Sequence, residues 1–529
     1  MTDWETDETS RLVPEDRLDP MVRKICLSVP PPSLEDNRGD VDRVLDTLAK
    51  REGSEAPFVP LSLAARISAV LYESDFQMTL VLAQSRRGWD VIDVEPGDTQ
   101  GAHWGMAVDL GSTNMVFYLV DLSRGMLVAR RAVENPQVRH GEDILSRIHE
   151  CREPEGLKKL QQLTVEAFNG EIAAILEARG IDSRHLYAFS VAGNTTMAHL
   201  LLGLSPLRIC REPYIPVVNR PDICQAREIG LAGNERAVLY VLPNVGSYVG
   251  GDVLAGILVS RLHDEDEVSI LVDVGTNAEI VLGSRQWLMV AAGAAGPALE
   301  GGVVKCGMRA AEGAIETVRI DRRSLKPSYR TIGDVMPLGL CGSGLIDLMA
   351  ELFLTRVIDE KGRIVAQSPY VVDCDGAAAY QVASSDESGT GEAIVLTELD
   401  INNLLRTKGA MYTALTVITR NAGISFQDLK RFHVAGTFGA YIDPRMAVTI
   451  GMVPDIPIDR YSHLKESAGM GACLCLCARE KREELDAICG KITYMELNVN
   501  GDFMNLLNAA MFIPHTDHSQ FPSVSGPRC

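Results

Sequence analysis

Two segments of the chain share a short pattern that could bind a phosphate group. Each starts with an aspartate at the end of an apolar strand, passes through glycine to polar residues and leads into a second strand: Asp109-Leu-Gly-Ser-Thr-Asn114 and Asp273-Val-Gly-Thr-Asn-Ala278. Glycine permits a tight turn, and backbone N–H groups and a hydroxyl at the tip can contact a phosphate. The aspartate can hold Mg²⁺ through water, because protein-bound Mg²⁺ keeps several waters.

The repetition of this pattern carries more information than either copy, since a single Gly-Ser or Gly-Thr hairpin is a common β-turn. The copies are separated by about 164 residues (273 minus 109), which is too long for a solenoid and fits a duplicated domain. A third glycine-containing turn, Ala435-Gly-Thr-Phe-Gly439, follows another short apolar strand. Two acidic hairpins facing each other would clamp a magnesium-bound triphosphate between two lobes.

The elements that position these turns follow from the pattern along the chain. From Trp104 onward, strands, glycine-rich turns and helices alternate, which predicts an α/β protein. A smaller α+β region precedes it, with helices expected at 40–50 and 61–71 and strands at 78–83 and 89–94. We expect a disordered N-terminus at 1–20, a small α+β domain at 21–100, a first lobe at 104–262, a second lobe at 268–515 and a flexible tail at 516–529.

Composition excludes several classes of protein. The 529 residues are 46% hydrophobic and 23% charged, as in a globular protein of more than one domain. The formal net charge of −20 argues against a nucleic-acid partner, which would need a basic surface. No apolar stretch approaches the roughly 18–20 residues of a membrane helix. The acidic N-terminus is unlike a signal peptide, so we expect a cytoplasmic protein, and its 12 scattered cysteines fit a reducing compartment.

The three turns resemble the phosphate-1, phosphate-2 and adenosine motifs of the actin/hexokinase/heat-shock-protein ATPase superfold. Further segments narrow the resemblance to the ATP-dependent reductive activators of corrinoid proteins: Val29-Pro-Pro-Pro-Ser-Leu-Glu-Asp36, Asn194-Thr-Thr-Met-Ala-His-Leu-Leu201, Pro243-Asn-Val-Gly-Ser-Tyr-Val-Gly-Gly-Asp252, Ala295-Gly-Pro-Ala-Leu-Glu-Gly301, Gly339-Leu-Cys-Gly-Ser-Gly-Leu-Ile346 and Phe432-His-Val-Ala-Gly-Thr-Phe-Gly-Ala-Tyr441. The resemblance covers roughly residues 21–515. It implies a duplicated ribonuclease-H-like fold beside the small N-terminal domain.

The resemblance also implies an activity. Members of this family reduce the cob(II)alamin of a corrinoid protein in a methyltransferase system to cob(I)alamin, as part of anaerobic metabolism. ATP with Mg²⁺ is the implied cofactor, and a homodimer is the implied assembly. For a one-electron step, each unfavourable increment of about 59 mV is a factor of ten in the equilibrium constant, so an energy source is needed.

The cysteines depart from the family pattern, in which an iron–sulfur cluster in the same chain delivers the electron. A plant-type cluster needs Cys-x₄-Cys-x₂-Cys and a fourth cysteine, whereas the first hundred residues contain only Cys26. Cys473, Cys475 and Cys477 fall in an expected helix at 468–481, where Cys475 would point away from the other two. We therefore expect no cluster in this chain and a separate low-potential iron–sulfur protein as the electron donor.

The candidate site residues follow from these motifs. The resemblance assigns phosphate contacts to the two hairpins, adenosine contacts to the third turn, and Mg²⁺ binding through water to Asp109 and Asp273, with Asp252 as a further catalytic candidate. The binding residues are Gly111, Ser112, Thr113, Asn114, Gly275, Thr276, Asn277, Gly436, Thr437, Phe438 and Gly439. Gly342, Ser343 and Gly344 either line the nucleotide or form a tight strand-to-helix turn. Asn135-Pro-Gln137 and the segment 141–146 look like a helix entry near the active face of the first lobe.

Several alternatives stay open at the level of sequence. Asp252 is either a helix N-cap or a carboxylate that orients water, and the same two alternatives apply to Glu300. His199 and His433 are candidate acid–base groups or structural histidines. The chain as a whole could instead be a nucleotide-switched chaperone or regulator of a corrinoid methyltransferase system, or a small-molecule kinase of the same superfold, since a fold alone does not give a function.

Overall fold

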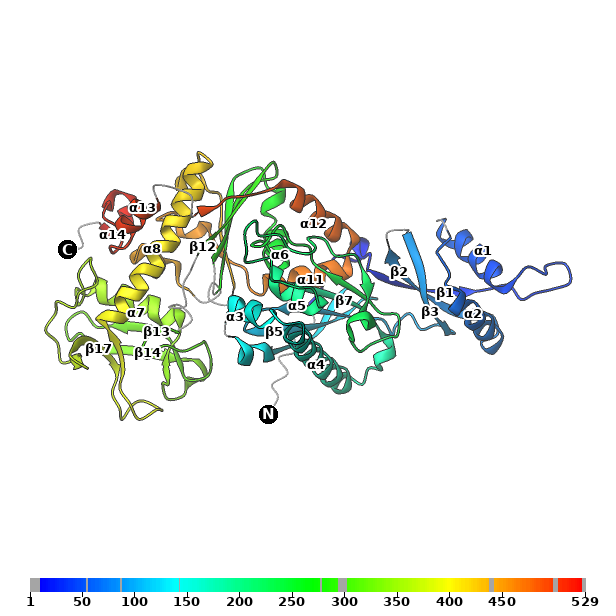
Figure 1. The fold of residues 1–529 in the computed structure, drawn as a ribbon, viewed down its shortest axis with the longest axis horizontal. Helices are drawn as coiled ribbons and strands as arrows, with labels where there is room; N and C mark the ends of the chain where they lie inside the picture. The colour runs from blue at the N-terminus through cyan, green and yellow to red at the C-terminus, as the bar shows by residue number, and fades with distance from the viewer. Residues whose placement is uncertain are drawn as a thin grey trace. The chain divides into compact units, whose positions relative to one another are not determined.

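The computed structural model (Figure 1) describes residues 10–53, 56–85, 88–141, 143–275, 278–293, 302–436, 442–497 and 503–525. Contacts within the chain divide it into two compact units. Unit 1 comprises Met1–Leu258 and Ala468–Gly490, and unit 2 comprises Val259–Ser467 and Lys491–Cys529. Each unit has its own hydrophobic core.

The small N-terminal part of unit 1 is a three-stranded antiparallel sheet covered by two helices. The two helices and two of the strands match the sequence prediction, whereas the first strand was not predicted. Its elements are β1 (Val22–Ser28), α1 (Asp40–Glu52), α2 (Leu61–Glu73), β2 (Gln77–Ser85) and β3 (Gly88–Pro96). On α2, Leu63, Ile67 and Leu71 are buried, which is the spacing of one helix face. That face closes a separate core over the sheet.

A buried ion pair fixes this small part to the rest of unit 1. Lys24 Nζ in β1 lies 2.6 Å from Glu95 Oε2 in β3. The hydroxyl of Tyr187, a residue of the neighbouring lobe, donates to Glu95, and the Lys24 ammonium lies 4.8 Å from the Tyr187 ring centroid. Burial raises the pKa of Glu95, but hydrogen bonds from Lys24, Thr99 and Tyr187 more than offset this and hold it below its usual value. Glu95 is therefore a buried carboxylate with its charge compensated.

The first lobe of unit 1 is built on a mixed sheet whose described strands run in the order β6-β5-β4-β7-β9-β8. The strands are β4 (Trp104–Leu110), β5 (Asn114–Asp121), β6 (Met126–Glu134), β7 (Leu186–Gly193), β8 (Cys224–Gln225) and β9 (Val238–Val241). The helices are α3 (Ile144–Glu150), α4 (Pro154–Arg179), α5 (Thr195–Leu202) and α6 (Gly251–Ser260). β4 pairs antiparallel with β5 and parallel with β7.

Unit 2 repeats this arrangement. Its main sheet runs β20-β19-β10-β11-β12-β21 in the described residues. The strands are β10 (Ser269–Val274), β11 (Ala278–Gly283), β12 (Leu288–Gly293), β19 (Phe432–Ala435), β20 (Tyr461–His463) and β21 (Ile492–Tyr494). β10 pairs antiparallel with β11 and parallel with β19, as β4 pairs with β5 and β7. Strand order and direction match over five strands, β6-β5-β4-β7-β9 in unit 1 and β12-β11-β10-β19-β20 in unit 2. The sixth strand differs, because β8 lies beside β9 whereas β21 lies beside β12.

Two smaller sheets and several helices complete unit 2. The sheets run β14-β13-β15 and β16-β17-β18. Their strands are β13 (Ala314–Ile320), β14 (Pro327–Thr331), β15 (Gly339–Leu340), β16 (Val371–Cys374), β17 (Ala377–Ala383) and β18 (Ile394–Thr397). The helices are α7 (Gly342–Leu354), α8 (Glu398–Asn421), α10 (Pro444–Thr449), α13 (Phe503–Ala510) and α14 (Pro522–Ser525).

The segment that carries the cysteine cluster belongs to unit 1, although the sequence placed it in the second lobe. It forms two helices, α11 (Ser467–Cys477) and α12 (Arg479–Lys491), rather than one continuous helix. A Cβ atom at Gly469 would lie 2.2 Å from the Tyr118 ring, and one at Gly471 would lie 2.4 Å from the Ala255 side chain. These glycines let α11 pack closely against β5 and α6. Contacts with distant residues, and not the position in the sequence, therefore place this segment in unit 1.

Both ends of the chain are more ordered in the described residues than the sequence suggests. Within the expected disordered stretch 1–20, Leu12 N donates to Gly125 O and Leu127 N donates to Ser10 O. Within the expected tail 516–529, the Phe521 side chain is fully buried in a small cluster with Tyr412 and Val448. Tertiary hydrogen bonds and apolar burial hold these segments despite their polar composition.

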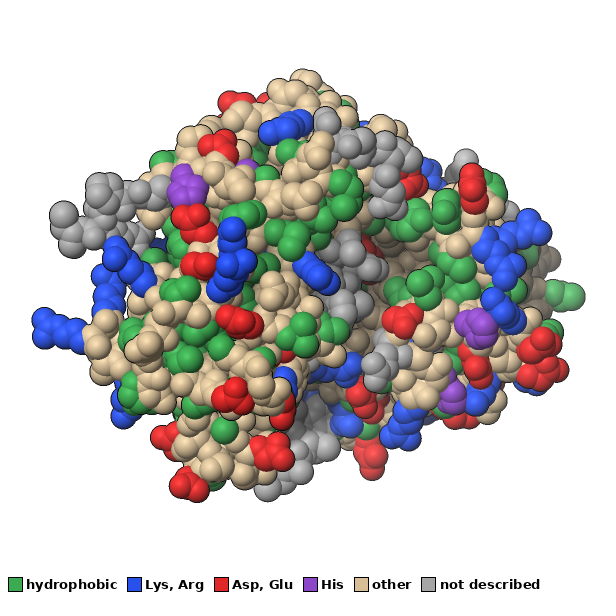
Figure 2. All heavy atoms as spheres, turned by 60° about the vertical axis from the view of Figure 1, so that its left-hand side comes forward, with side chains coloured by type: hydrophobic (Ala, Val, Ile, Leu, Met, Phe, Trp, Pro, Cys, Tyr) green, Lys and Arg blue, Asp and Glu red, His purple; other side chains and the backbone are tan. Residues whose placement is uncertain are grey.

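On the face drawn in Figure 2, acidic and basic side chains are interspersed. None of the helices within the described ranges has the length and apolar character needed to cross a bilayer.

Candidate functional site

The first hairpin joins two strands at the centre of the unit 1 sheet. Asp109 is the second-last residue of β4 and is held on both sides, since it pairs with Val116 of β5 and with Ala192 of β7. The tip, Gly111-Ser112-Thr113, is half-buried. A Cβ atom at Gly111 would lie 2.6 Å from Asn114 O. Glycine is therefore required here because the backbone of Asn114 approaches too closely to leave room for a side chain.

The second hairpin has the same relation to the unit 2 sheet. Asp273 in β10 pairs with Glu279 of β11 and with Ala435 of β19. Gly436, which follows β19, has a φ of +84°, and a Cβ atom there would lie 2.4 Å from Val274 O and 2.6 Å from Asp273 Oδ1. The start of the third turn is thus brought against the second acidic hairpin. Gly275 is described, while the following candidates lie outside the described residues: Thr276, Asn277, Glu300, Thr437, Phe438 and Gly439.

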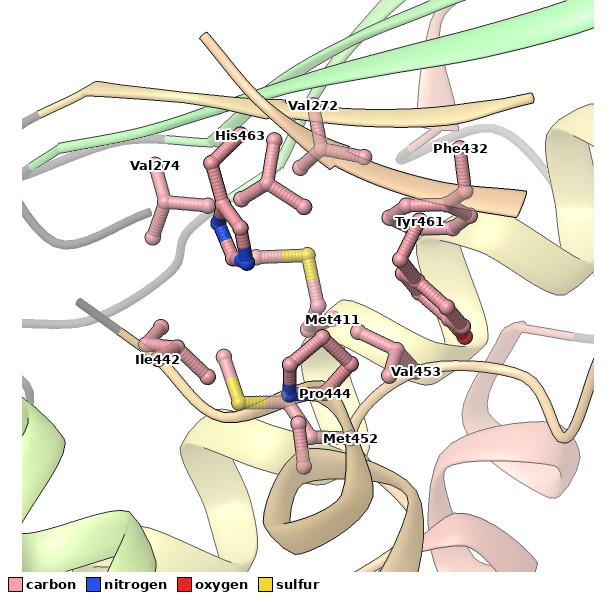
Figure 3. A pocket seen from close by; sticks show the side chains of 12 residues that line it. Val272, Val274, Met411, Phe432, Ile442, Pro444, Met452, Val453, Tyr461 and His463 are labelled. Atoms are coloured by element: carbon pink, nitrogen blue, oxygen red, sulfur yellow. The ribbon is translucent and has the colours of Figure 1, made fainter. Parts of the chain in front are cut away.

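An apolar pocket lies on one face of the unit 2 sheet, and the Asp273 side chain lies on the opposite face. Figure 3 shows Val272 and Val274 of β10 pointing into a cavity of about 30 Å³ together with Phe432 of β19. Successive side chains of a strand point to opposite faces, so Asp273 faces the other side of the sheet. The cavity is far smaller than the roughly 300–1,000 Å³ of small-molecule sites. It is a packing defect in the core beneath the hairpin, and the carboxylate lies on the opposite face.

The duplication includes a further motif that the sequence analysis did not recognise. In unit 1 the strand beside the hairpin ends in Val191-Ala-Gly193, and in unit 2 it ends in Val434-Ala-Gly436. A Cβ atom at Gly193 would lie 2.7 Å from Leu110 O, as one at Gly436 would lie 2.4 Å from Val274 O. In both units a glycine lets the neighbouring strand pass close behind the acidic hairpin. The repeated Val-Ala-Gly could have revealed this from the sequence.

Asp252 lies in the first turn of α6, which begins at Gly251, so it is not the N-cap that one interpretation of the sequence proposed. Its Oδ1 accepts a hydrogen bond from Val253 N at 2.8 Å. A Cβ atom at Gly250 would lie 2.6 Å from this oxygen and 2.8 Å from Gly193 O, so the carboxylate is next to the strand that passes the first hairpin. Burial raises the pKa of Asp252 to about 6.

We expect Asp252→Asn to gain stability and lose activity. The pKa of about 6 in the folded chain exceeds the unfolded value of about 3.9. The ionised carboxylate therefore destabilises the folded state above pH 6, and this cost falls as the pH drops from about 6 to about 4 and is absent at lower pH. After discounting for partial exposure, the variant should gain about 1–2 kcal/mol in unfolding free energy at pH 8 and little at pH 4. Chemical denaturation at the two pH values measures the difference.

The same variant should hydrolyse ATP about 100-fold more slowly if the carboxylate orients water. Wild-type hydrolysis should then rise with pH through about 6, where the Asp252 carboxyl ionises. Asp182→Asn is the control, because hydrogen bonds from Arg184 hold the pKa of that exposed carboxyl at about 2. Full ATPase activity in Asp252→Asn would show that Asp252 serves stability alone.

Gly342, Ser343 and Gly344 are the first three residues of α7, and a single residue, Cys341, separates them from β15, so the chain turns sharply from strand into helix here. All three are buried, and Ser343 Oγ lies 3.3 Å from Cys341 Sγ. A Cβ atom at Gly344 would lie 2.1 Å from Ile315 O, so α7 packs directly on β13. This geometry is that of the strand-to-helix turn, one of the two alternatives from the sequence. Contact of these residues with a nucleotide stays a prediction.

The two histidines have structural partners. His199 Nδ1 lies 2.7 Å from Thr195 O, and His199 Nε2 accepts a hydrogen bond from Val217 N at 3.0 Å. His433 Nδ1 lies 2.6 Å from Ser462 Oγ. Burial lowers the pKa of both imidazoles, to about 4 for His433. Both rings are therefore neutral near pH 7, and their contacts fit the structural alternative.

The clustered cysteines are core residues of unit 1. Cys473, Cys475 and Cys477 are fully buried on α11. Burial raises the pKa of the Cys475 and Cys477 thiols to about 12, which opposes the thiolate form that binds metal. Within the described ranges, no group of three or more His, Cys, Asp or Glu side chains is placed to hold a metal ion.

Comparison with known proteins identifies the family. Three RACo descriptions match successive parts of the chain: the RACo linker region over residues 15–101, the RACo middle region over 104–265, and the C-terminal domain of RACo, the ASKHA domain, over 267–525. A curated relative, "Corrinoid activation enzyme RamQ" of Eubacterium limosum, is 30% identical over 471 residues, which are 87% of this chain and 78% of the relative. The chain belongs to the RACo family.

Two further proteins are similar to this chain. A solved structure titled "Reductive activator for corrinoid,iron-sulfur protein" matches 97% of this chain and 82% of its own chain, with a TM-score of 0.88 and 36% identity. The "[Co(II) methylated amine-specific corrinoid protein] reductase" of Methanosarcina barkeri is 27% identical over 236 residues, 41% of this chain and 40% of that protein. The predicted resemblance to reductive activators of corrinoid proteins and the predicted ATPase superfold are both confirmed.

Proposed function

We propose that this RACo-family chain uses ATP to drive the one-electron reduction of a corrinoid protein from cob(II)alamin to cob(I)alamin. The proposal is carried by similarity along 97% of the chain to a reductive activator for a corrinoid, iron–sulfur protein. The names of both curated relatives point to the same chemistry, since one is a corrinoid activation enzyme and the other a reductase of a corrinoid protein.

The acidic hairpins provide groups that suit ATP and Mg²⁺. Asp109 and Asp273 would hold the ion through water, and bound Mg²⁺ would neutralise phosphate charge. Gly193 and Gly436 leave no room for a side chain behind either hairpin, as expected where backbone must approach a ligand closely. Phosphates would contact Gly111, Ser112, Thr113, Asn114, Gly275, Thr276 and Asn277, and adenosine would contact Gly436, Thr437, Phe438 and Gly439. Asp252 would orient the attacking water.

The electron balance requires a donor. One electron from a low-potential iron–sulfur protein reduces Co(II) to Co(I), while hydrolysis of ATP to ADP and phosphate supplies the free energy. We propose that this donor is a separate protein, because the clustered thiols on α11 are buried and have raised pKa values. A homodimer belongs to the same proposal and can be measured by light scattering.

An anaerobic spectroscopic assay tests the function. The purified chain is mixed with a cob(II)alamin-loaded corrinoid protein and a strong one-electron reductant, with ATP, ADP or a non-hydrolysable ATP analogue. The cob(I)alamin spectrum should develop only with hydrolysable ATP. An unchanged cobalt state with ATP-dependent affinity for the corrinoid protein would instead identify a regulator. Transfer of phosphate to a metabolite would identify a kinase.

A further inference from the structure

The tip of the first hairpin is held from behind by side chains outside the hairpin. Asn135 Nδ2 donates to Gly111 O at 2.8 Å, and Arg147 Nη2 donates to Ser112 O at 2.5 Å. In a trans peptide the C=O and the following N–H point in opposite directions. The N–H of Ser112 therefore points away from Asn135, and the N–H of Thr113 points away from Arg147.

These two N–H groups are available to a ligand. Neither Ser112 N–H nor Thr113 N–H donates to an acceptor among the described residues. Adjacent backbone N–H groups at a turn form a concavity that binds anions. The carbonyl oxygens, which would repel a phosphate, are occupied by Asn135 and Arg147 on the protein side. The hairpin is therefore preorganised as a donor for an anion.

Arg147 is an unusual choice for such a support because it is a fully buried cation. Its other hydrogen bonds also go to uncharged groups: Gly141 O at 2.9 Å, Gln137 Oε1 at 3.4 Å and Met197 Sδ at 3.3 Å. Arg147 has no ion-pair partner within the described ranges, although the charge of Asp143 on the same helix acts on it through space. Burial lowers the pKa of Arg147 to about 10, so the guanidinium is still charged at pH 7.

A buried, uncompensated charge costs free energy unless something offsets it. Asn135 shows that a neutral amide can hold a hairpin carbonyl equally well, so support of the backbone alone does not require arginine. An anion at the hairpin tip would offset the charge of Arg147 in a region of low dielectric, where the attraction is strong. A polyanion bound at the hairpin tip would therefore offset the positive charge that lies directly behind it.

We propose that Arg147 is a positioning residue of the nucleotide site that orients Thr113 N–H toward the phosphates and favours the triphosphate over less charged ligands. The inference rests on the proposed function, because it assumes that the first hairpin binds ATP. The buried guanidinium would also provide selectivity, because each additional phosphate charge on the ligand is attracted to it. Selectivity for ATP over ADP, and for ADP over adenosine, should then depend on residue 147.

Calorimetric titration of Arg147→Met with ATP, ADP and adenosine tests this. Methionine keeps the apolar length of the side chain and removes its charge and donors. Losing a charge-assisted contact should weaken ATP binding about 10- to 100-fold. ADP should lose less, and adenosine binding should not change. Arg147→Lys, which keeps the charge but not the planar fork, should recover part of the ATP affinity. If the methionine variant does not fold, the lysine variant provides the test, and its ATP affinity should lie below that of the wild type.

Arg43→Met is the matched control. Arg43 is also fully buried but lies on α1, where it donates to Asp36 Oδ2 at 2.6 Å and Asp36 O at 2.8 Å. This variant should lose stability and keep the wild-type ratio of ATP to adenosine affinity. Equal losses for ATP and adenosine in Arg147→Met, or unchanged ATP affinity, would overturn the inference while the proposed function stands. A wild-type chain without ATP affinity would overturn both.

Discussion

Asp109→Asn should lower ATP hydrolysis, and ATP-dependent corrinoid reduction with it, by about a thousandfold. The side chain lies on a strand paired on both sides, with Val116 and with Ala192, so its position is fixed before any ligand arrives. Asparagine keeps the shape and removes the charge that would hold Mg²⁺ through water. Phosphate release and the appearance of the cob(I)alamin spectrum measure the two losses independently.

Asp121→Asn is the matched control for this variant. Asp121 is a buried carboxylate at the other end of the same strand pair, where it accepts hydrogen bonds from Ser123 N at 2.9 Å and Ser123 Oγ at 2.6 Å. Its replacement should cost about 1–2 kcal/mol of unfolding free energy and leave hydrolysis unchanged. Similar activity losses in both variants would mean that Asp109 acts through stability and not through the metal.

Gly436→Ala should cause a loss of hydrolysis comparable with that of Asp109→Asn, together with about 2–4 kcal/mol of stability. Alanine resists the φ of +84°, and its Cβ would lie 2.4 Å from Val274 O and 2.6 Å from Asp273 Oδ1. The second acidic hairpin must shift to make room, which displaces the carboxylate that would share the magnesium. Thermal unfolding and the hydrolysis rate measure the two effects on the same sample.

Gly423→Ala separates the effect of backbone strain from the effect of the close contact with Asp273. Gly423 follows α8 and has a similar φ of +69°, but a Cβ atom there would meet nothing within 4 Å. This variant should lose only about 1 kcal/mol, from backbone strain, and keep its activity. If Gly436→Ala behaves in the same way, the close contact with Asp273 has no role in catalysis.

Much of the fold could be predicted because its signals are local. Turn residues and apolar periodicity located both hairpins and the helices α1 and α2, and the repeated Asp-x-Gly pattern indicated the duplication that the strand orders of the two sheets display. The candidate phosphate residues could be proposed for the same reason, and their role stays a prediction. Each hairpin is a short continuous segment whose chemistry and shape are visible in a few residues.

The features that sequence analysis missed depend on contacts between distant residues. Arg147 reaches Ser112 across 35 positions, and no local pattern marks an arginine that donates to a hairpin carbonyl. The placement of α11 in unit 1 depends on whether Gly469 fits against Tyr118, which periodicity cannot show. The tight turn at Gly111 was recognised, but its physical cause, the approach of Asn114 O, appears only in three dimensions.

The proposed function requires both acidic hairpins to bind a single nucleotide. Equilibrium titration of the wild-type chain with ATP and Mg²⁺ should give one ATP per chain, and Asp109→Asn and Asp273→Asn should each abolish that binding alone. Two independent ATP sites per chain, or wild-type affinity in either variant, would contradict it.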